Sequence, residues 1–268
     1  MSAPAAESTR GTGALRRKAR KLLRGDRPAW PGEPARWGPN TAHTNEAARN
    51  RAAYRQLAAA LEYAAGRYAR GRLVDIGCGR KPWQGVFAPH VDEYIGVDHA
   101  ETLHGLEGID VIAGAYDVPL ADGTADTVLL MEVLEHLESP ARALAEVRRL
   151  LGPGGHLILT TPFSWPLHEE PRDFFRYSPY GLRHLCREAD LDVLEIHPLS
   201  GIWTTLALQF SWALQRHRFR APRLVDALCA GGQRLAWEWD RRDRQETMSW
   251  NHLLVARRPD APPAPRTA

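Results

Sequence analysis

The sequence predicts an α/β fold in which a mostly parallel sheet lies between layers of helices. Short apolar runs alternate along the chain with segments of helical pattern, an order typical of parallel sheets. The first run is followed by the turn Gly77-Cys78-Gly79, and the second ends in an acid, Asp98. Such a turn and acid are typical of a nucleotide-cofactor site. The 268 residues, 44% of them hydrophobic, suffice for one medium-sized catalytic domain.

Five apolar runs predict the first strands of the sheet. They are Leu73–Ile76, Tyr94–Val97, Asp110–Ala113, Thr127–Met131 and Leu157–Thr161. A helix is expected before them, from Thr44 or Asn45, because these residues can cap and an Ala-rich run follows. Ligands bind beyond the carboxyl ends of the strands in open parallel sheets, so the residues after the runs are expected to meet at one site.

Capping and helix-breaking residues mark the remaining elements. Ser139-Pro140 starts a helix that Gly152–Gly155 ends, and Ser178-Pro179 starts a second one. Leu191–Ile196 and Asn251–Ala256 are the last two apolar runs, and we expect the second of them to close the sheet.

The acid in the first strand indicates which cofactor the turn binds. Asp75 stands two residues before Gly77, where a dinucleotide would place its pyrophosphate, and the like charges would repel. S-adenosylmethionine brings an ammonium and a sulfonium instead. Asp98 is then the acid expected to accept hydrogen bonds from a ribose.

With these residues the chain resembles the class I S-adenosylmethionine-dependent methyltransferases, with a methyltransferase type 11-like domain. The resemblance is close over Arg72–Pro162 and looser to about Arg258; residues 114–120 and 126–137 are similar to further family segments. It implies a Rossmann-like three-layer sandwich with a mostly parallel seven-stranded sheet and an antiparallel last strand. It also implies S-adenosyl-L-methionine as methyl donor, bound by Asp75, Gly77, Cys78, Gly79, Asp98, His99, Ala115, Tyr116, Met131 and Glu132.

Two positions depart from the family pattern. Lys81 stands where the turn usually has its third glycine, which leaves the path of the loop open. Gly114 stands where an acid often meets the adenine amino group. The adenine is then left to backbone groups near Ala115 and Tyr116, or to Asp117.

The segment after the fifth run, residues 161–178, mixes ionisable and aromatic residues and is too long for a simple connector. It is similar to a subgroup of methyltransferases with a His, Pro, Asp, Arg and Tyr pattern. The matching residues here are His168, Pro171, Asp173, Arg176 and Tyr177.

Methyl transfer requires a protein to align the acceptor and, for a hydroxyl, to remove its proton. His168 is the first candidate for the base and His136 the second, and Asp173 and Tyr177 complete the catalytic candidates. Two alternatives stay open. His168 and Asp173 can instead form an ion-paired lattice with Arg176 that shapes the site, and His136 can orient the loop rather than touch substrate.

No metal is expected from the sequence. His168-Glu169-Glu170 lacks a second His at helical spacing, and Pro171 prevents a regular helix there. Cys78, Cys186 and Cys229 have no spacing suited to zinc, an iron cluster or a disulfide framework, which favours a reducing compartment.

The chain is expected to carry a tail at each end of the catalytic domain. Residues 1–42 form a basic arm, 43–258 the methyltransferase domain, and 259–268 a disordered Pro-rich tail. The arm is either solvated or in contact with anionic lipid or nucleic acid; no aromatic residues alternate with its bases, which disfavours nucleic acid.

A helical, acceptor-side insertion is expected at about residues 200–245, with an apolar stripe of Trp203, Leu206, Ala207, Phe210 and Leu214. The stripe either packs on the sheet or on a partner in a homodimer, or forms a membrane-surface helix or an acceptor channel; Arg216, His217, Arg218 and Arg220 follow it. The longest apolar stretch, about Leu199 to Leu214, is shorter than the roughly 20 residues of a spanning helix. Because the cysteines favour a reducing compartment and no continuous apolar core follows Arg16-Arg17, as an export signal would have, we expect a cytoplasmic protein, open to peripheral contact with a membrane.

The function expected from these features is methyl transfer to a small or glycosylated acceptor, with oxygen ahead of nitrogen or carbon. High Ala and Arg content indicates a GC-rich genome, for which specialised-metabolite or cell-envelope glycan pathways are both reasonable. Two other classes are open: a cofactor-binding scaffold without transfer activity, suggested by Lys81 and Gly114, and a nicotinamide oxidoreductase, which Asp75 disfavours.

Overall fold

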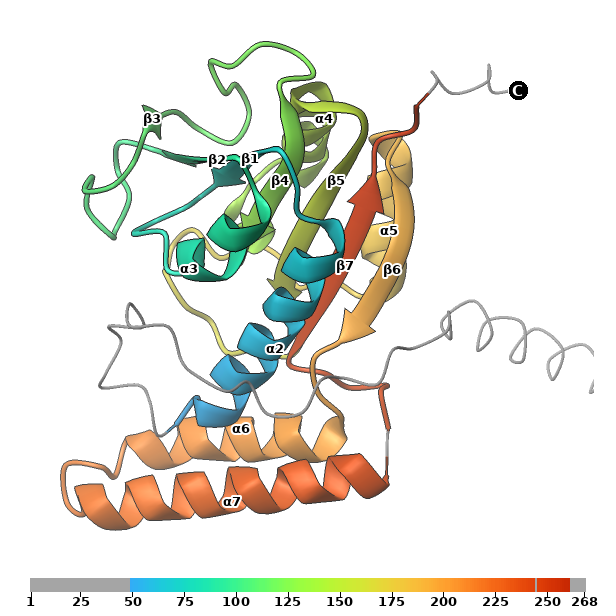
Figure 1. The fold of residues 1–268 in the computed structure, drawn as a ribbon. Helices are drawn as coiled ribbons and strands as arrows, with labels where there is room; N and C mark the ends of the chain where they lie inside the picture. Colours follow the sequence, from blue (N-terminus) through green and yellow to red (C-terminus); the bar gives the residue numbers. More distant parts are fainter. Residues whose placement is uncertain (1–48, 244, 261–268) are drawn as a thin grey trace, which may run out of the picture. The chain divides into compact units, whose positions relative to one another are not determined.

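Seven strands form a single sheet in the order β3-β2-β1-β4-β5-β7-β6 (Figure 1). The computed structural model describes residues 49–243 and 245–260. The strands are β1 (Arg72–Ile76), β2 (Glu93–Asp98), β3 (Val111–Ile112), β4 (Ala125–Met131), β5 (Leu151–Pro162), β6 (Asp192–Pro198) and β7 (Asn251–Arg257). Each of the seven apolar runs of the sequence therefore forms a strand, as predicted.

The pairing confirms a mostly parallel sheet with an antiparallel last strand. Each adjacent pair from β3 to β5 is parallel, while β7 lies antiparallel between β5 and β6. The carboxyl ends of β1, β2, β4 and β5 therefore lie at one edge of the sheet, where ligand sites are found in folds of this kind.

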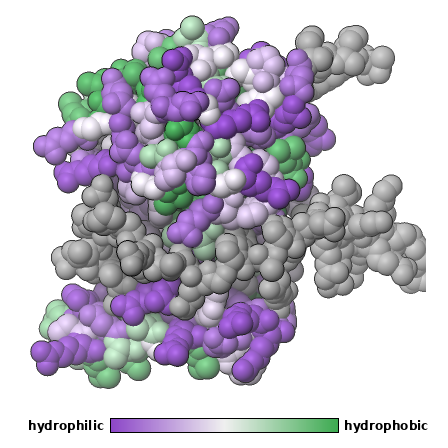
Figure 2. All heavy atoms as spheres, in the orientation of Figure 1, coloured by the Kyte–Doolittle hydropathy of each residue, from purple (hydrophilic) through white to green (hydrophobic). Residues whose placement is uncertain are grey.

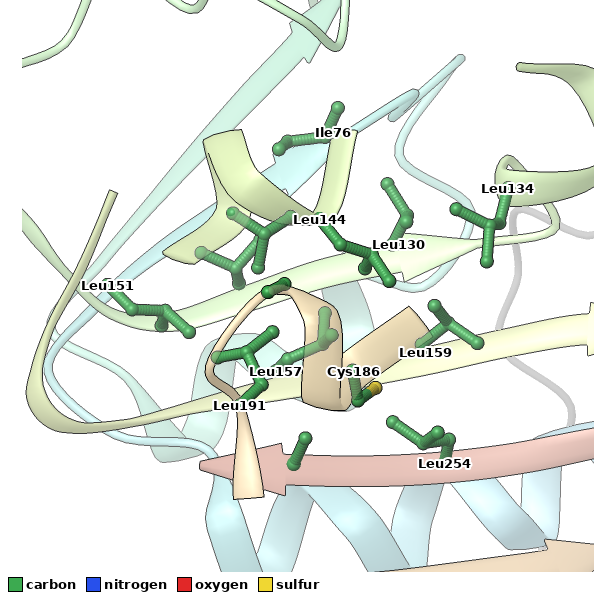
Figure 3. Packing of buried hydrophobic residues seen from close by; sticks show 14 of the residues in the cluster. Ile76, Leu130, Leu134, Leu144, Leu151, Leu157, Leu159, Cys186, Leu191 and Leu254 are labelled. Carbon is green, nitrogen blue, oxygen red and sulfur yellow. The ribbon is translucent and has the colours of Figure 1, made fainter. Parts of the chain in front are cut away.

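Two apolar clusters fill the space between the sheet and its helices, so the fold has three layers. The helices are α2 (Arg51–Tyr68), α3 (Gln84–Phe87), α4 (Pro140–Leu150), α5 (Pro179–Glu188), α6 (Ile202–Gln215) and α7 (Pro222–Arg242). On one face, Leu144 of α4 and Cys186 of α5 pack against β-strand residues such as Leu157 (Figure 3). On the other face, α2 contributes Leu57 and Leu61.

Helices α4 and α5 start where the sequence predicts, but only one of the two predicted N-terminal caps is formed. Ser178 accepts a hydrogen bond from Gly181 N at 3.1 Å and caps α5, as expected. The Ser139 side chain makes no such bond at α4, so the expectation of a cap there is wrong, although the helix starts at Pro140. Thr44 and Asn45, the predicted start of the first helix, lie outside the described residues; α2 is described from Arg51.

The glycine-rich segment 152–155 is part of β5 rather than a loop. α4 ends at Leu150 and the strand begins at the next residue, with Leu151 paired to Ala125 of β4. A Cβ on Gly155 would lie 3.0 Å from Gly152 O and 3.2 Å from Ala125 O. The glycines therefore permit a close backbone approach as well as ending the helix.

Helices α6 and α7 lie between β6 and β7, within the range where the sequence predicts a helical insertion (Figure 1). The carboxylate of Asp240 in α7 accepts hydrogen bonds from Gly201 N, Trp203 N and Thr204 N, at 3.0 to 3.1 Å. One helix thus caps the other. A Cβ at residue 201 would lie 2.4 Å from Asp240 Oδ1, which explains the glycine there.

The apolar stripe of α6 does not pack on the sheet, contrary to one of the interpretations of the sequence. The buried residues of α6 are Thr204, Thr205, Leu208 and Ser211. Trp203, Leu206 and Phe210 are exposed, and Figure 2 shows hydrophobic residues among hydrophilic ones at the surface of the part formed by α6 and α7. Within residues 49–243 and 245–260, no helix combines the length and the apolar character that crossing a membrane requires.

Candidate functional site

The glycine turn follows β1 at the carboxyl edge of the sheet. Gly77 and Gly79 have φ values of 73° and 49°, which glycine adopts without steric cost. The amides of Gly77 and Cys78 both donate to Val97 O, at 2.8 and 3.1 Å, so the turn is fastened to β2. A Cβ on Gly77 would lie 2.4 Å from a methyl of Val133, so a larger residue would displace the segment that follows β4.

Asp98 lies beside this turn at the end of β2. One carboxylate oxygen accepts a hydrogen bond from Gly79 N at 2.8 Å, and the other accepts from His99 N at 2.7 Å. Each carboxylate oxygen has more than one acceptor site, so Asp98 keeps capacity for the hydroxyl groups of a ligand.

Asp75 is buried beneath the turn. Its carboxylate accepts a hydrogen bond from the Tyr94 hydroxyl at 2.6 Å. Burial raises the pKa of Asp75 to about 7; the Tyr94 hydrogen bond opposes this shift and the charge of Asp98 adds to it. A buried carboxyl with such a pKa favours a cationic ligand over an anionic one, because a cation stabilises its ionised form.

Lys81, the departure from the glycine pattern, keeps the turn in place. It adopts φ 52°, the left-handed conformation that glycine would take. Its ammonium donates to Asp110 Oδ2 at 2.5 Å. Its side chain lies on Gly96, where a Cβ would come within 2.2 Å of Lys81 Cε. The ion pair and this contact hold a conformation that is costly for a residue other than glycine.

The segment expected near the adenine follows β3. Ala115 and Tyr116 are half-buried and Asp117 is exposed. The Tyr116 hydroxyl accepts a hydrogen bond from Ser139 N at 3.1 Å, and the Arg142 guanidinium lies 4.8 Å from the centre of its ring. Tyr116 therefore connects this segment to the start of α4.

Glu132 follows β4 directly and has a left-handed backbone, with φ 54°. Asn251 of β7 donates to both oxygens of its carboxylate, at 2.7 and 2.8 Å. Burial raises the pKa of Glu132, and hydrogen bonds from Thr160 and Asn251 oppose the shift. A residue other than glycine in this conformation stores strain, and such residues are common at functional sites.

Glu135, His136 and His168 come together at the end of β4. Each offers one ligand atom, and the three atoms lie within 4.8 Å of one another. The rings of His136 and His168 are 4.7 Å apart, edge to face. Burial, and then the neighbouring His136, lower the pKa of His168, so its imidazole is the neutral form near pH 7. Burial also raises the pKa of Glu135.

The ion-paired lattice expected as one alternative is present in the loop after β5. Arg176 donates to both carboxylate oxygens of Asp173, at 2.5 and 2.7 Å. Asp173 Oδ2 also accepts from His168 N at 3.0 Å. The Arg176 hydrogen bonds are the main cause that lowers the pKa of Asp173 to about 2. The lattice fixes the backbone that carries His168.

Two further contacts attach this loop to the sheet. The Tyr177 hydroxyl is buried and donates to Leu134 O at 3.0 Å. His136 Nδ1 donates to Arg172 O at 2.5 Å. Tyr177 and His136 thus both connect the loop to the segment that follows β4.

Helix α6 borders the same loop. The Trp165 ring lies 5.6 Å from that of Trp212 in α6 and 5.2 Å from that of Trp250. Gln209 of α6 donates to Ser164 O at 3.0 Å. Of the tryptophans after residue 230, Trp250 is buried here, whereas Trp237 and Trp239 are exposed.

The expected residues fall into two groups that meet at the carboxyl edge of the sheet. The turn with Asp75 and Asp98 forms the first, and the residues after β4 with His168 form the second; Gly77 touches Val133, which directly follows Glu132. Sequence reasoning missed Tyr94, Asn251 and the buried Glu135. Glu135 precedes His136 in a quoted family segment, so its position was a usable signal.

Comparison with known proteins shows the family. Residues 48–230 match the family described as Methyltransferase domain, which is more than half of the chain. The chain belongs to this family, and its fold is that of the class I S-adenosylmethionine-dependent methyltransferases.

Curated relatives are similar over part of their length. An uncharacterised 37.1 kDa protein in transposon TN4556 of Streptomyces fradiae is 35% identical over 101 residues, 33% of this chain and 29% of that protein. A ubiquinone biosynthesis O-methyltransferase of Burkholderia thailandensis is 31% identical over 162 residues, 48% of this chain and 70% of the relative.

A solved structure has the same fold. It is the 1,6-didemethyltoxoflavin-N1-methyltransferase of Burkholderia thailandensis, with bound 1,6-didemethyltoxoflavin and S-adenosylhomocysteine. The TM-score is 0.50 at 16% identity, and the alignment covers 97% of this chain and 94% of the other. At this identity the likeness concerns the fold.

Proposed function

We propose that this protein transfers a methyl group from S-adenosylmethionine to a small-molecule or glycosylated acceptor, with oxygen as the first choice of acceptor atom. The observation that carries the proposal is the buried Asp75 carboxyl beneath the glycine turn, with Asp98 hydrogen-bonded to Gly79. This arrangement favours a cationic cofactor that carries a ribose.

The residues present fit this cofactor. Asp98 would accept hydrogen bonds from the ribose hydroxyls, and the segment at Ala115 and Tyr116 would meet the adenine. The turn and Asp75 would hold the methionine part, because glycines leave the backbone open to close approach. S-adenosylmethionine supplies a methyl group bonded to a cationic sulfur, and an in-line displacement requires of the protein mainly alignment and desolvation.

His168 is the residue that we propose to accept the acceptor proton. Its neutral imidazole near pH 7 suits a general base. Asp173 and Arg176 position it, since their bonds fix the His168 backbone. His136 is the second candidate. Tyr177 shapes the site through its bond to Leu134 O.

Oxygen as the acceptor atom is supported by the relative named an O-methyltransferase. Nitrogen stays an alternative, because the solved structure of the same fold is that of an N-methyltransferase. A role in specialised-metabolite or cell-envelope glycan biosynthesis in the cytoplasm follows from the sequence composition and stays a prediction.

An untargeted mass comparison tests the proposal. Extracts of cells with and without the protein are searched for pairs of compounds that differ by one methylene, and fragmentation locates the added methyl. A methylated compound that disappears without the protein supports the proposal. If the purified protein binds S-adenosylmethionine but methylates no acceptor in such extracts, a scaffold role replaces it.

We also propose that the exposed face of α6 and α7 contacts an anionic membrane surface. This hairpin face consists of Trp203, Leu206, Phe210, Leu224, Leu228, Leu235 and Trp239. Trp203 and Trp239, one from each helix, lie 5.7 Å apart. The exposed Arg216, Arg220 and Arg223 lie at the turn between the helices, and basic residues beside an apolar face suit anionic lipid.

Sedimentation with lipid vesicles tests the membrane contact. The wild type is expected to bind anionic vesicles and not neutral ones, and the double variant Leu206→Ser/Phe210→Ser is expected to lose the binding. If instead the wild type binds neither vesicle and light scattering finds a dimer that the double variant loses, the face is a homodimer contact.

A further inference from the structure

Glu135 has a buried carboxylate oxygen without a partner. Oε2 accepts a hydrogen bond from Thr161 Oγ1 at 3.1 Å, whereas Oε1 makes no hydrogen bond among the described residues. The side chain is 0% exposed. An unpaired buried carboxylate oxygen is costly, which points to a ligand that would satisfy it.

The unpaired oxygen faces His136. Glu135 Oε1 lies 3.8 Å from His136 Nε2, and the Glu169 carboxylate lies 3.8 Å from the same nitrogen on its more exposed side. His136 Nδ1 donates its hydrogen to Arg172 O, so in the neutral imidazole the lone pair is on Nε2. In a metal-binding histidine, the ring nitrogen that does not bind the metal commonly donates its hydrogen to a backbone carbonyl or a carboxylate, which orients the imidazole.

His168 approaches this group from the loop after β5. Its Nδ1 lies 3.3 Å from two acceptors, Pro166 O and Asp173 Oδ2, and 3.5 Å from the guanidinium of Arg176, a donor; the two nearer acceptors favour a hydrogen on this nitrogen. The lone pair is then on Nε2. Two imidazoles with their Nδ1 atoms occupied, next to an unpaired carboxylate oxygen, provide neutral and anionic ligands without competing hydrogens.

We propose that Glu135, His136 and His168 bind a divalent transition-metal ion, with Glu169 as a fourth ligand. Two imidazoles and carboxylates suit zinc, manganese or iron rather than magnesium or calcium, which prefer oxygen alone. Metal–ligand bonds of about 2.1 Å place neighbouring ligand atoms roughly 3.4 Å apart. Since the three atoms lie within 4.8 Å, side-chain movements of about 1 Å would close the site.

The prediction from the sequence that no metal binds was based on the segment around His168 alone. It looked for a second histidine at helical spacing from His168, and none is present. The second histidine, His136, comes instead from the segment after β4, 32 residues earlier in the chain. The fold brings the two side chains together, which spacing in one segment does not reveal.

A bound ion would change the chemistry of the acceptor, a consequence that depends on the proposed function. It would bind the acceptor hydroxyl and lower its pKa, so the O–H bond breaks with the proton released to solvent. The oxygen then forms its bond to the methyl carbon while the carbon–sulfur bond of the donor breaks. With the ion bound, His168 would act as a metal ligand instead of as the base proposed above.

Metal binding is measured on the full chain, without an affinity tag or S-adenosylmethionine. The apo protein is titrated with Co²⁺ and followed by visible absorption, and with Zn²⁺ by calorimetry. One equivalent is expected to bind. Glu135→Gln and His136→Ala are expected to weaken binding by roughly 100-fold or more, since each removes a ligand. His184→Ala, an exposed histidine of α5, is the matched control and is expected to bind like the wild type.

The outcomes separate this inference from the proposed function. If wild-type protein takes up no Co²⁺ or Zn²⁺, or if both ligand variants bind as the wild type does, the metal site is wrong. The wild-type titration tests the metal site even if a variant fails to fold. S-adenosylmethionine binding is measured separately on the same metal-free protein, so a failure to bind metal and a failure to bind the cofactor can be told apart.

Discussion

At the scale of single residues, the candidate site contains acidic side chains that the fold has removed from water. Asp75, Glu132 and Glu135 are acids with pKa values raised by burial; Asp75 and Glu135 each accept one side-chain hydrogen bond, whereas Asn251 donates to both oxygens of Glu132. Keeping such groups buried costs stability, so their presence at one edge of the sheet indicates that they serve a ligand.

Asp75 gives the first prediction, a pH dependence of cofactor binding. Its pKa in the folded protein is about 7, above the value of 3.8 for a free carboxyl, so Asp75 is protonated below pH 7 and ionised above it. The ionised form attracts S-adenosylmethionine. Affinity is expected to rise with pH up to about 7, by at most about tenfold per pH unit, and then to level off.

The variant Asp75→Asn serves as the control in calorimetry from about pH 5.5 to about pH 8.5, roughly 1.5 pH units on each side of the transition. It is expected to bind weakly and to lose the part of the pH dependence that Asp75 causes. An identical pH profile in variant and wild type would remove Asp75 from cofactor recognition.

Asp173 gives the second prediction, a lower turnover number with unchanged cofactor binding. Asp173→Asn weakens the pairing with Arg176 that fixes the His168 backbone, so kcat is expected to fall by roughly 100-fold. Binding of S-adenosylmethionine is expected to stay unchanged, and the pH profile of kcat to shift, because His168 loses a neighbouring negative charge.

The same variant is expected to melt at a lower temperature. The Asp173 pKa is lowered from 3.8 to about 2, so its stabilising effect is present above pH 3.8 and is lost as pH falls through about 2. At neutral pH the variant therefore loses the whole effect. If melting changes while kcat of the folded fraction and its pH profile do not, the lattice is structural only.

At the scale of helices and strands, the chain uses contacts between distant elements to complete its helices. The carboxylate of Asp240, in α7, caps the start of α6 through three backbone amides. Gln233 of α7 accepts a hydrogen bond from Ala52 N in α2 at 2.9 Å. The hairpin is therefore part of the fold that borders the site.

Removal of the interhelical cap is the third prediction. Asp240→Ala is expected to lower the free energy of unfolding by about 1–2 kcal/mol, because three buried amides lose their acceptor. Asp226→Ala on the same helix removes only a half-buried pair with Arg218, and is expected to cost less than about 1 kcal/mol. Thermal or urea unfolding measures both, and equal effects would contradict the capping role.

The strands were predictable from the sequence because the runs that form them are apolar and separated by clear helix signals. The start of β5 was not, since Gly152–Gly155 is a helix-breaking pattern and its strand pairing depends on Ala125 of β4. The direction that α6 faces was not predictable either. Its small polar residues Thr204, Thr205 and Ser211 are buried, which reverses the usual amphipathic pattern.

Local signals also explain which parts of the site could be predicted from the sequence. The glycine turn and the acid Asp98 were recognisable because they depend on local backbone geometry. The hydrogen bond of Asn251 to Glu132 joins residues 119 apart, and the approach of His136 to His168 joins two separate segments. Such contacts arise from the sheet order, so a single sequence contains no local signal for them.

At the scale of the whole molecule, the family and fold assign a methyl donor while the residues around the site determine the acceptor. Many functions share this fold, so the choice of chemistry depends on the side chains after β4 and β5. Arg176 holds the loop after β5, and α6 packs beside it through Trp165 and Trp212. These elements are the part of the chain in which we expect acceptor specificity to lie.

The most direct test of the central claim is calorimetric titration of the purified protein with S-adenosylmethionine and, separately, with a nicotinamide dinucleotide. The buried acid beneath the turn predicts that the sulfonium compound binds at one site per chain and that the dinucleotide gives no heat of binding. Tight binding of the dinucleotide, with none of S-adenosylmethionine, would contradict the assignment of cofactor and of function.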